Sequence, residues 1–483
     1  MFVRKIKSRK STCFQIGEKV YGKFKLLKHV GCATTDTEIE ILQLKAKSEL
    51  QELNFKNQLE LFPEIKKSLK AKLINWHITG YHLVFGKVYD AIGFPDNILR
   101  DLVVARIVYP RSKDATVRYL QNYLGISVHR DRVYRFLDTL KKEELTSIAY
   151  KFVTLKNKEI SLIFYDVTTL HFETDKEDEL KQKGFSKNHR GDMPQILIGL
   201  FVDNEGYPFD FDFFTGNTFE GHTFQTSVAN LLKKYQFDKL TIVADAGMLS
   251  QDNLLYLEKE GINYIVGARL KSTNAKMVKE IISHNYINDP TKKIQTDTHQ
   301  LIIEYSETRA KKDNKTREKI IEKLQKKLDT GKPVIHKNKF LLIATKDKPT
   351  KLDTKKIEAD KQFDGLKGYI TNNSNTSSEE EVINQYHNLW KIEKAFRMSK
   401  SDLKERPIFH KTTNRIKSHL ILCFVSLLVM KESERILNQG EYSIQKTIEV
   451  MGKVGEGEIS IANITMPLES ESTHEIQNIL KLF

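Results

Sequence analysis

The chain has 483 residues, 40% of them apolar and 29% charged, which is the composition of a soluble globular protein with a well-buried core. The 78 Lys and Arg exceed the 63 Asp and Glu, so the formal net charge is +15 and the pI is near 9.3. This excess indicates a polyanionic partner, most simply nucleic acid, unless it reflects a general lysine bias. The longest apolar run, at 420–430, is shorter than the stretch of about 18–20 residues that spans a bilayer, which excludes a membrane helix there.

The first residues and the cysteines bear on the compartment. The start, MFVRKIKSRK, is basic but is not followed by an uninterrupted apolar segment, so no signal peptide is expected. The cysteines Cys13, Cys32 and Cys423 lie far apart without CxxC spacing, which argues against both a zinc site and a disulfide framework. We therefore expect a cytoplasmic protein in a reducing compartment.

The amino-terminal part divides into two regions. Residues 1–90 mix short strand-like and helical segments and indicate no clear fold, whereas 91–150 has a helical pattern. Within it, a helix at about 113–124, the turn LGIS and a basic helix at 128–140 are typical of a helix-turn-helix. Arg130, Arg132 and Arg135 would then contact DNA; the alternative is a helical hairpin with solvated arginines.

Strand and helix signals alternate in residues 151–270. Strands are predicted at 160–172, 195–202 and 207–214, the last two joined by the turn DNEG. A helix at about 222–235, a strand at 239–245, a helix at about 250–260 and a strand at 262–270 follow. Three strands in hairpin order, followed by helix, strand, helix and strand, predict an α/β fold with a mixed sheet flanked by helices.

The composition changes after residue 270. Residues 271–377 are Lys-rich and polar, with a charged helix predicted at 316–329, and we interpret them as an insertion before a last core helix. The linker NNSNTSSEEE ends in a Ser followed by acidic residues, a strong helix start, so 378–435 is expected to complete the core. Residues 436–483 form a carboxy-terminal tail region.

Two aspartates accompany apolar strands. Asp166 lies in ISLIFYDVTTLHFET and Asp245 ends LTIVADAGMLS. A buried, unpaired carboxylate costs several kcal/mol, so Asp166 is expected to be paired, to lie at a strand end or to hold a cation. Open α/β sheets place ligand groups at the carboxyl ends of their strands, where both aspartates would meet, although a strand-end Asp is also a common helix cap.

A third acid lies on the helix predicted over 379–403. Its apolar stripe, spaced by three and four residues, contains Val382, Tyr386, Leu389, Glu393, Phe396 and Lys400. Glu393 therefore falls on the inward face, where it needs a cation or an intrahelical pair with Arg397. Three such carboxylates can hold two divalent ions for phosphoryl transfer, and oxygen-only ligands suit Mg²⁺ or Mn²⁺.

Four blocks in this order, FYDVTTLHFE, GFSKNHRGDMPQILIGL, VADAGMLS and YHNLWKIEKAFRMSKSDLKERPIFH, resemble the DDE transposases of insertion sequences in the broad IS4 group, most closely the IS1634 type. The resemblance covers roughly 90–430. It implies an RNase H-like catalytic core with an insertion before the last helix. It also implies that Asp166, Asp245 and Glu393 are the catalytic, metal-binding acids.

The family's signature on the last helix is Tyr, two residues, Arg, three residues, Glu, six residues, Lys. Tyr386, Glu393 and Lys400 match it, and Leu389 stands in the place of the arginine. By resemblance, Tyr386 and Lys400 contact phosphates at the transposon end. The missing arginine's contact would pass to Lys391, Lys394 or Arg397.

Lys187, His189 and Arg190 lie in a predicted loop between the first two core strands, where they either contact DNA or are solvated.

The expected function is therefore that of a transposase. It would bind the terminal inverted repeats of its own element in double-stranded DNA, cut with the help of divalent metal ions and join the freed ends to target DNA. Pairing two ends implies a homodimer, and the setting would be a prokaryotic cytoplasm and its nucleoid. The alternatives are a catalytically inactive DNA-binding protein derived from a transposase, and a metal-dependent nuclease without strand transfer.

Overall fold

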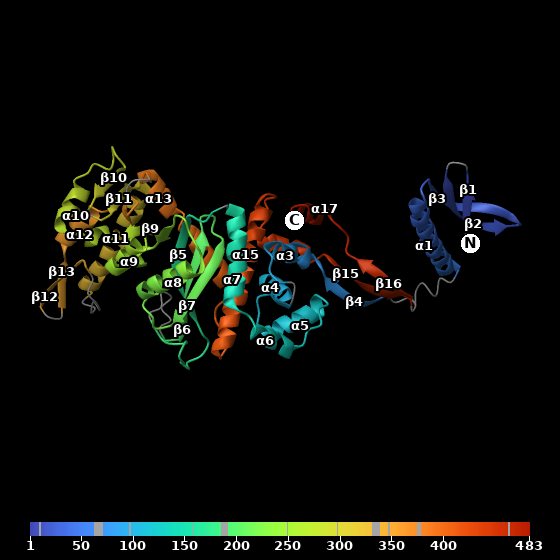
Figure 1. The fold of residues 1–483 in the computed structure, drawn as a ribbon, viewed down its shortest axis with the longest axis horizontal. Coiled ribbons are helices and arrows are strands. Elements are labelled where there is room, and N and C mark those ends of the chain that lie inside the picture. The colour runs from blue at the N-terminus through green and yellow to red at the C-terminus, as the bar shows by residue number, and fades with distance from the viewer. Residues whose placement is uncertain are drawn as a thin grey trace. The chain divides into compact units, whose positions relative to one another are not determined.

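A computed structural model describes residues 1–8, 11–61, 71–95, 98–157, 159–184, 192–248, 250–296, 298–330, 339–345, 348–373, 378–461 and 464–483. The chain forms two compact units (Figure 1). The first comprises Met1–Trp76 and Glu456–Glu469, and the second His77–Gly455 and Ser470–Phe483. Among the described residues, no helix is both long enough and apolar enough to cross a membrane.

The first unit contains two small antiparallel arrangements of strands. Strands β1 (Phe2–Lys7), β2 (Thr12–Val20) and β3 (Lys23–Ala33) form one sheet, against which helix α1 (Asp36–Leu61) packs. Alternate residues of β2, including Phe14 and Ile16, are buried beneath the helix, as the two-residue period of a strand requires. The second sheet has the order β16 (Ile464–Glu469), β15 (Gly455–Ile461), β4 (Lys72–Ile78).

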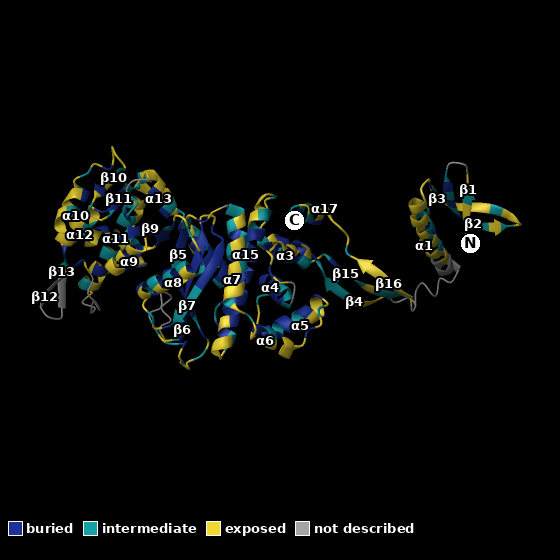
Figure 2. Cartoon of the chain, viewed as in Figure 1, coloured by how far each residue is buried: buried dark blue, intermediate teal, exposed yellow. Residues whose placement is uncertain are grey.

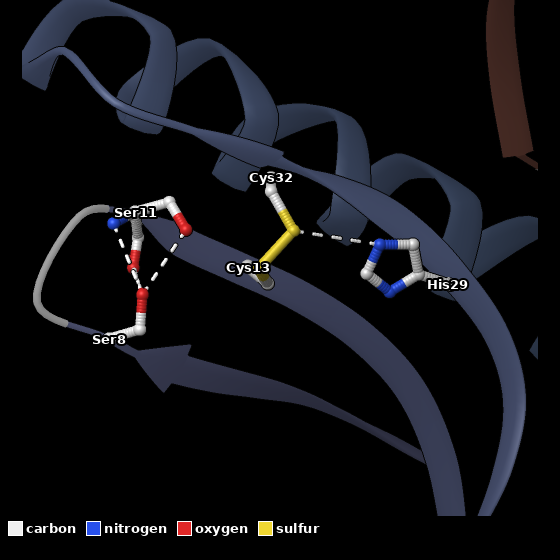
Figure 3. The surroundings of a disulfide bond; sticks show 5 residues. All are labelled: Ser8, Ser11, Cys13, His29 and Cys32. Atoms are coloured by element: carbon white, nitrogen blue, oxygen red, sulfur yellow. Dashed lines mark hydrogen bonds between the residues drawn. A yellow bond between two sulfur atoms is a disulfide. The ribbon is translucent and has the colours of Figure 1, made fainter.

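A disulfide joins Cys13 to Cys32, so the expectation that the chain has no disulfide is wrong (Figure 3). The two residues are 19 positions apart but stand directly opposite each other on the antiparallel strands β2 and β3. The Cα atoms of this pair are 4.0 Å apart, a close approach that lets the two sulfurs meet. The strand register, which cysteine spacing does not reveal, creates this pair. Cys423 is free and buried.

The second unit is built on an eight-stranded mixed sheet with the order β10-β11-β14-β9-β8-β5-β6-β7. Strands β5 (Leu162–His171), β6 (Gln195–Asp203) and β7 (Pro208–Thr215) are antiparallel neighbours. Strands β8 (Thr241–Ala244) and β9 (Asn263–Ala268) run parallel to β5 on its other side. The predicted α/β fold with a mixed sheet is confirmed.

Helices cover both faces of this sheet, which is why every residue of β6 is buried (Figure 2). Figure 1 shows α8 (Glu220–Lys234) on one side of β5–β7 and, on the other, α7 (Lys142–Asn157) and α15 (Thr413–Asn438). Helix α9 (Gln251–Lys259) connects β8 to β9. The apolar run at 420–430 is the buried centre of α15.

Residues 275–371 extend the sheet beyond β9. Strands β14 (Leu366–Thr371), β11 (Gln300–Tyr305) and β10 (Thr291–Gln295) are added in antiparallel order. The same segment contains α10 (Ala275–Ile282), the hairpin of β12 (Leu341–Thr345) and β13 (Lys348–Leu352), and α12 (Thr354–Lys361). The charged helix is longer than predicted: α11 spans Glu307–Asp329 and begins with Ser306 as its cap.

The helical region before the sheet is close to its prediction. It contains the π-turn η1 (His82–Gly86), α3 (Lys87–Ile92), α4 (Ile98–Val108), α5 (Lys113–Tyr123) and α6 (Arg130–Leu137). Helix α5 starts where the Ser112 hydroxyl accepts a hydrogen bond from the Ala115 amide (3.3 Å), and the turn after it uses Gly125 at a φ of +68°. Helices α16 (Ile444–Met451) and α17 (His474–Leu480) close the unit.

The helix predicted over 379–403 is two helices and a π-turn: α13 (Glu379–His387), α14 (Trp390–Arg397) and η4 (Met398–Asp402). It begins as predicted, because the Ser378 hydroxyl accepts from the Glu381 amide at 3.1 Å. Between α13 and α14 the backbone bonds shorten to three residues, as in Leu389 N–H to Tyr386 O at 3.0 Å. This tightening changes the rotation per residue, so one continuous helical period does not describe the segment.

Candidate active site

Asp166 and Asp245 lie side by side because of the register between β5 and β8. The last parallel pair in that register is Tyr165 with Ala244, and each of these two residues is followed directly by its aspartate. Asp245 directly follows its strand, as predicted, whereas Asp166 lies inside β5, at the point where β8 ends. Asp166 is half-buried and accepts a hydrogen bond from the Val167 amide at 2.8 Å, while Asp245 is exposed.

Glu393 reaches the same area from α14, which packs against β5 and β6. Its predicted inward position is wrong: the stripe residues Tyr386, Leu389 and Phe396 are buried, but Glu393 is exposed. The cause is the break between α13 and α14, which rotates Glu393 away from the packed face. Glu393 forms no ion pair with Arg397 or with any other residue that the structure describes.

The phenol of Tyr386, on α13, is influenced electrostatically by all three carboxylates. Burial raises the pKa of its phenol far above the usual range, and the negative charges of Asp245, Glu393 and Asp166 raise it further, in that order. Its ring packs at 4.6 Å against that of Tyr369. The phenol also lies over β9, where a Cβ on Gly267 would meet its oxygen at 2.5 Å. The three acids, which are far apart in the sequence, therefore lie near enough to one buried tyrosine for their charges to raise its pKa.

Lys367, on β14, is a site residue that the sequence did not single out. Its ammonium lies 4.6 Å from the centre of the Tyr386 ring. Burial lowers the pKa of Lys367, whereas the charges of Glu304, Asp245 and Glu393 act in the opposite direction. Lys367 thus supplies positive charge to a group of carboxylates. Its place in a Lys-rich segment conceals it in the sequence.

A second layer supports Tyr386 from β11 and β14. The Tyr369 hydroxyl donates to Glu304, and the His387 Nε2 lies 2.8 Å from the same carboxylate. Burial and the Glu304 charge raise the pKa of Tyr369 far above the usual range, so its hydroxyl keeps its proton. This network holds the end of α13 against the sheet.

The signature residues after Glu393 have different surroundings. The Lys400 ammonium donates to the Thr168 hydroxyl on β5 and lies 5.6 Å from the centre of the Phe396 ring. Arg397 is exposed at the end of α14, and its charge partly offsets the burial that raises the pKa of Asp402. Lys400 is therefore held next to β5, and Arg397 is exposed.

The remaining predicted DNA contacts are distributed between α6 and a segment that is not described. Arg130, Arg132 and Arg135 are exposed on α6, whose Val133 and Leu137 are buried. Lys187, His189 and Arg190 lie outside the described residues.

The donor chemistry of the three acids suits a hard divalent cation, because carboxylate oxygens are the ligands that Mg²⁺ and Mn²⁺ prefer. Asp245 and Glu393 are exposed and make no ion pair to a described residue, so their oxygens are available as ligands. In the part of the chain that is described, no three His, Cys, Asp or Glu side chains stand close enough together to hold a metal ion. Like charges repel, and a cation bound by the three carboxylates would relieve that repulsion.

Residues 157–429, more than half of the chain, match the family model of the Transposase DDE domain. Among solved structures, the piggyBac transposase synaptic complex with hairpin DNA shares 11% identity over 77% of this chain and 76% of that chain, with a TM-score of 0.39. The Mos1 transposase paired-end complex with left transposon end shares 11% identity over 41% of this chain and 60% of that chain, with a TM-score of 0.17. No curated protein matches the sequence.

Proposed function

The chain belongs to the family of transposases with a DDE domain, and from this premise we propose that it cuts and joins DNA at Asp166, Asp245 and Glu393. The observation that carries the proposal is the register of β5 and β8, which brings Asp166 next to Asp245, with Glu393 on α14 close enough that all three charges raise the pKa of Tyr386. A retired active site would have no reason to retain three charged acids around one buried side chain.

We further propose that the element is an insertion sequence of the IS4 group, IS1634 type. In this proposal the sheet of β5–β9 is an RNase H-like core, and residues 271–377 are an insertion before its last helix. The helical region 91–150 binds the terminal inverted repeats through Arg130, Arg132 and Arg135. That these arginines are exposed on one basic helix supports this assignment.

Asp166, Asp245 and Glu393 would hold Mg²⁺ or Mn²⁺, and two such ions supply an activated water or sugar hydroxyl and stabilise the leaving oxygen. Lys367 and Lys400 bring positive charge to the scissile phosphate. The Tyr386 hydroxyl, kept protonated by its raised pKa, donates a hydrogen bond to a phosphate oxygen. Arg397, Lys187, His189 and Arg190 would contact the flanking backbone.

In the first step water attacks the phosphodiester and frees a 3′-hydroxyl. In the second step that hydroxyl attacks a phosphodiester of the target DNA, forming a new phosphodiester bond and breaking the old one, whose 3′-oxygen leaves as a free 3′-hydroxyl of the target strand. Two ends must be held together for joining, which in our proposal requires a homodimer acting in the cytoplasm, on the nucleoid.

The test is cleavage and strand joining on DNA that carries the flanking ends of the element, with Mn²⁺ or Mg²⁺. Asp245→Asn removes one acid without changing its size, and Asp252→Asn on the exposed face of α9 is the matched control. We expect wild type and Asp252→Asn to cut and join, and Asp245→Asn to bind the ends without cutting.

Three other results would contradict the proposal. Cutting that survives Asp245→Asn would mean that the acids have been assigned wrongly. End binding without cutting by wild type would favour the inactive DNA-binding protein. Cutting without any joined product would favour a nuclease that lacks strand transfer.

A further inference from the structure

A cavity of about 550 Å³ in the second unit is lined by basic residues. It lies between the end of α4, the start of α5 and the segment 404–410 that follows η4. Five of its lining residues are Lys or Arg: Arg106, Arg111, Lys113, Lys404 and Arg406. None of the lining residues, all of which are described, is Asp or Glu. The cavity therefore has the charge of an anion-binding site.

Lys113 is the most informative of these residues. It is only 4% exposed, yet it makes no ion pair or side-chain hydrogen bond to a described residue. It is also the first residue of α5, where the helix dipole disfavours a cation. Burial lowers the pKa of Lys113 to about 7, and the Arg106 charge acts in the same direction. A buried ammonium in such a position is unfavourable for folding unless an anion joins it.

Arg106 is a second buried cation beside the cavity. It is 5% exposed, and its guanidinium donates to the carbonyl oxygens of Arg111 at 3.0 Å and Lys404 at 3.2 Å. Its Nε is buried and has no hydrogen-bond partner. The buried carboxylate of Glu405 acts on Arg106 electrostatically but accepts its hydrogen bond from the Ser399 hydroxyl at 2.6 Å. The guanidinium thus has donor capacity left over.

Two histidines near Lys113 and Arg106 have lowered pKa values. Burial and the charges of Lys113 and Arg106 lower the pKa of His410 to about 4. The same influences lower the pKa of buried His419, whose Nε2 lies 3.0 Å from the Glu405 carbonyl oxygen. Burial, the larger cause, disfavours any charge, but the smaller contribution from Lys113 and Arg106 is a positive field that attracts an anion.

We infer that this cavity binds a backbone phosphate of a DNA strand, at a site separate from the carboxylates. The unpartnered Lys113 ammonium matches phosphate oxygens. Arg106, whose guanidinium also donates to the Cys423 sulfur at 3.7 Å, adds its positive charge to the cavity. Tyr109, Tyr134 and Phe409 add aromatic walls on which a sugar or base can pack. The phosphate site stands on the geometry alone, whereas naming DNA as the carrier rests on the proposed function.

The cavity wall is tied to the catalytic strand. The Ile408 amide donates to the His171 carbonyl at 3.1 Å, and Ile408 forms a β-bridge with Phe172, one residue beyond β5. Asp166 and Phe172 are six positions apart on this extended segment, which corresponds to about 20 Å. One bound stretch of DNA can therefore reach both sites.

The test uses the full chain in EDTA, so that no cutting occurs. Inorganic phosphate is titrated against chloride at equal ionic strength while the thermal unfolding midpoint is measured, and DNA of the element's ends is then titrated in a binding assay. Lys113→Met removes the charge at similar length, Lys113→Arg keeps it, and Lys151→Met on the exposed face of α7 is the control.

We expect phosphate to raise the midpoint of wild type, Lys113→Arg and Lys151→Met, and Lys113→Met to bind phosphate and DNA at least about tenfold more weakly. Phosphate stabilisation that persists in Lys113→Met would overturn the site. Weaker phosphate binding with unchanged DNA binding would overturn DNA as its carrier. If Lys113→Met does not fold, Lys113→Gln gives the same comparison.

Failure of this inference is distinguishable from failure of the proposed function. The binding assays contain no metal, so they do not depend on cutting by the carboxylates. Asp245→Asn is expected to bind phosphate as wild type does. Loss of cutting in Asp245→Asn with unchanged phosphate binding in Lys113→Met would retain the transposase and reject only the second site.

Discussion

Replacing Lys113 by Met is expected to stabilise the ligand-free protein, most strongly near neutral pH. The side chain is 4% exposed and has no ion-pair partner among the described residues, so its charged form is disfavoured in the folded state. Burial lowers the pKa of Lys113 from 10.5 to about 7. Because a difference of one pKa unit is worth about 1.4 kcal/mol, the full penalty is about 5 kcal/mol, an upper bound for a group that can relax.

The sign of the pH dependence follows from proton binding. Between pH 7 and pH 10 the unfolded chain keeps the Lys113 proton while the folded chain loses it, so the stability of wild type rises with pH. The penalty is complete below about pH 7 and disappears as the pH approaches the unfolded value. The advantage of Lys113→Met is therefore expected to shrink by about 2 kcal/mol between pH 7 and pH 9.

The groups that face Lys113 do not obscure this comparison. His410 and His419 are neutral above pH 7, because burial and the nearby cations lower their pKa values. Cys423 remains a thiol, because burial raises its pKa. Glu405, whose pKa is raised by burial, is present in both proteins.

The assay is calorimetric unfolding of wild type, Lys113→Met and Lys151→Met at pH 7 and pH 9, in buffers without phosphate or sulfate. A Lys113→Met protein that is less stable than wild type at pH 7 would refute the reasoning. So would a stability difference that is the same at both pH values, because it would have no electrostatic origin.

Three further changes probe other parts of the fold. Gly267→Ala places a Cβ 2.5 Å from the Tyr386 hydroxyl and is expected to lower the free energy of unfolding by about 1–3 kcal/mol. The loss should be smaller in a Tyr386→Phe background, which lacks that hydroxyl. Equal losses in both backgrounds, measured by denaturant unfolding, would contradict the contact. Replacing Cys13 and Cys32 by Ser opens a link between residues 19 apart, at a cost of about 3 kcal/mol, and a reductant should then lower the unfolding midpoint of wild type only. Leu428→Ala, fully buried in α15, is expected to lose about 2–5 kcal/mol in denaturant unfolding, and Leu428→Met less than about 1.5; similar losses would argue against tight packing there.

Local patterns in the sequence were sufficient for the strands β5–β9, but not for β10, β11 and β14, which extend the sheet. Alternating and continuous apolar runs located β5, β6 and β7, and the Ser378 cap located the start of α13. These features depend on the periodicity of side chains along one segment, which is written in the sequence itself. The placement of Asp245 after an apolar strand could be predicted for the same reason, since it needs only the end of that strand.

Contacts between distant segments were decided only in the folded chain. The pairing of Cys13 with Cys32 depends on the register of β2 against β3, and the tightened turn before α14 turns Glu393 outward. Lys367 becomes a site residue only because the fold places it against the Tyr386 ring. Lys113 is notable only because the fold buries it in a cavity lined by no Asp or Glu. Local sequence sets the identity and period of side chains, whereas their neighbours, and therefore their charge states, follow from packing among elements far apart in the chain.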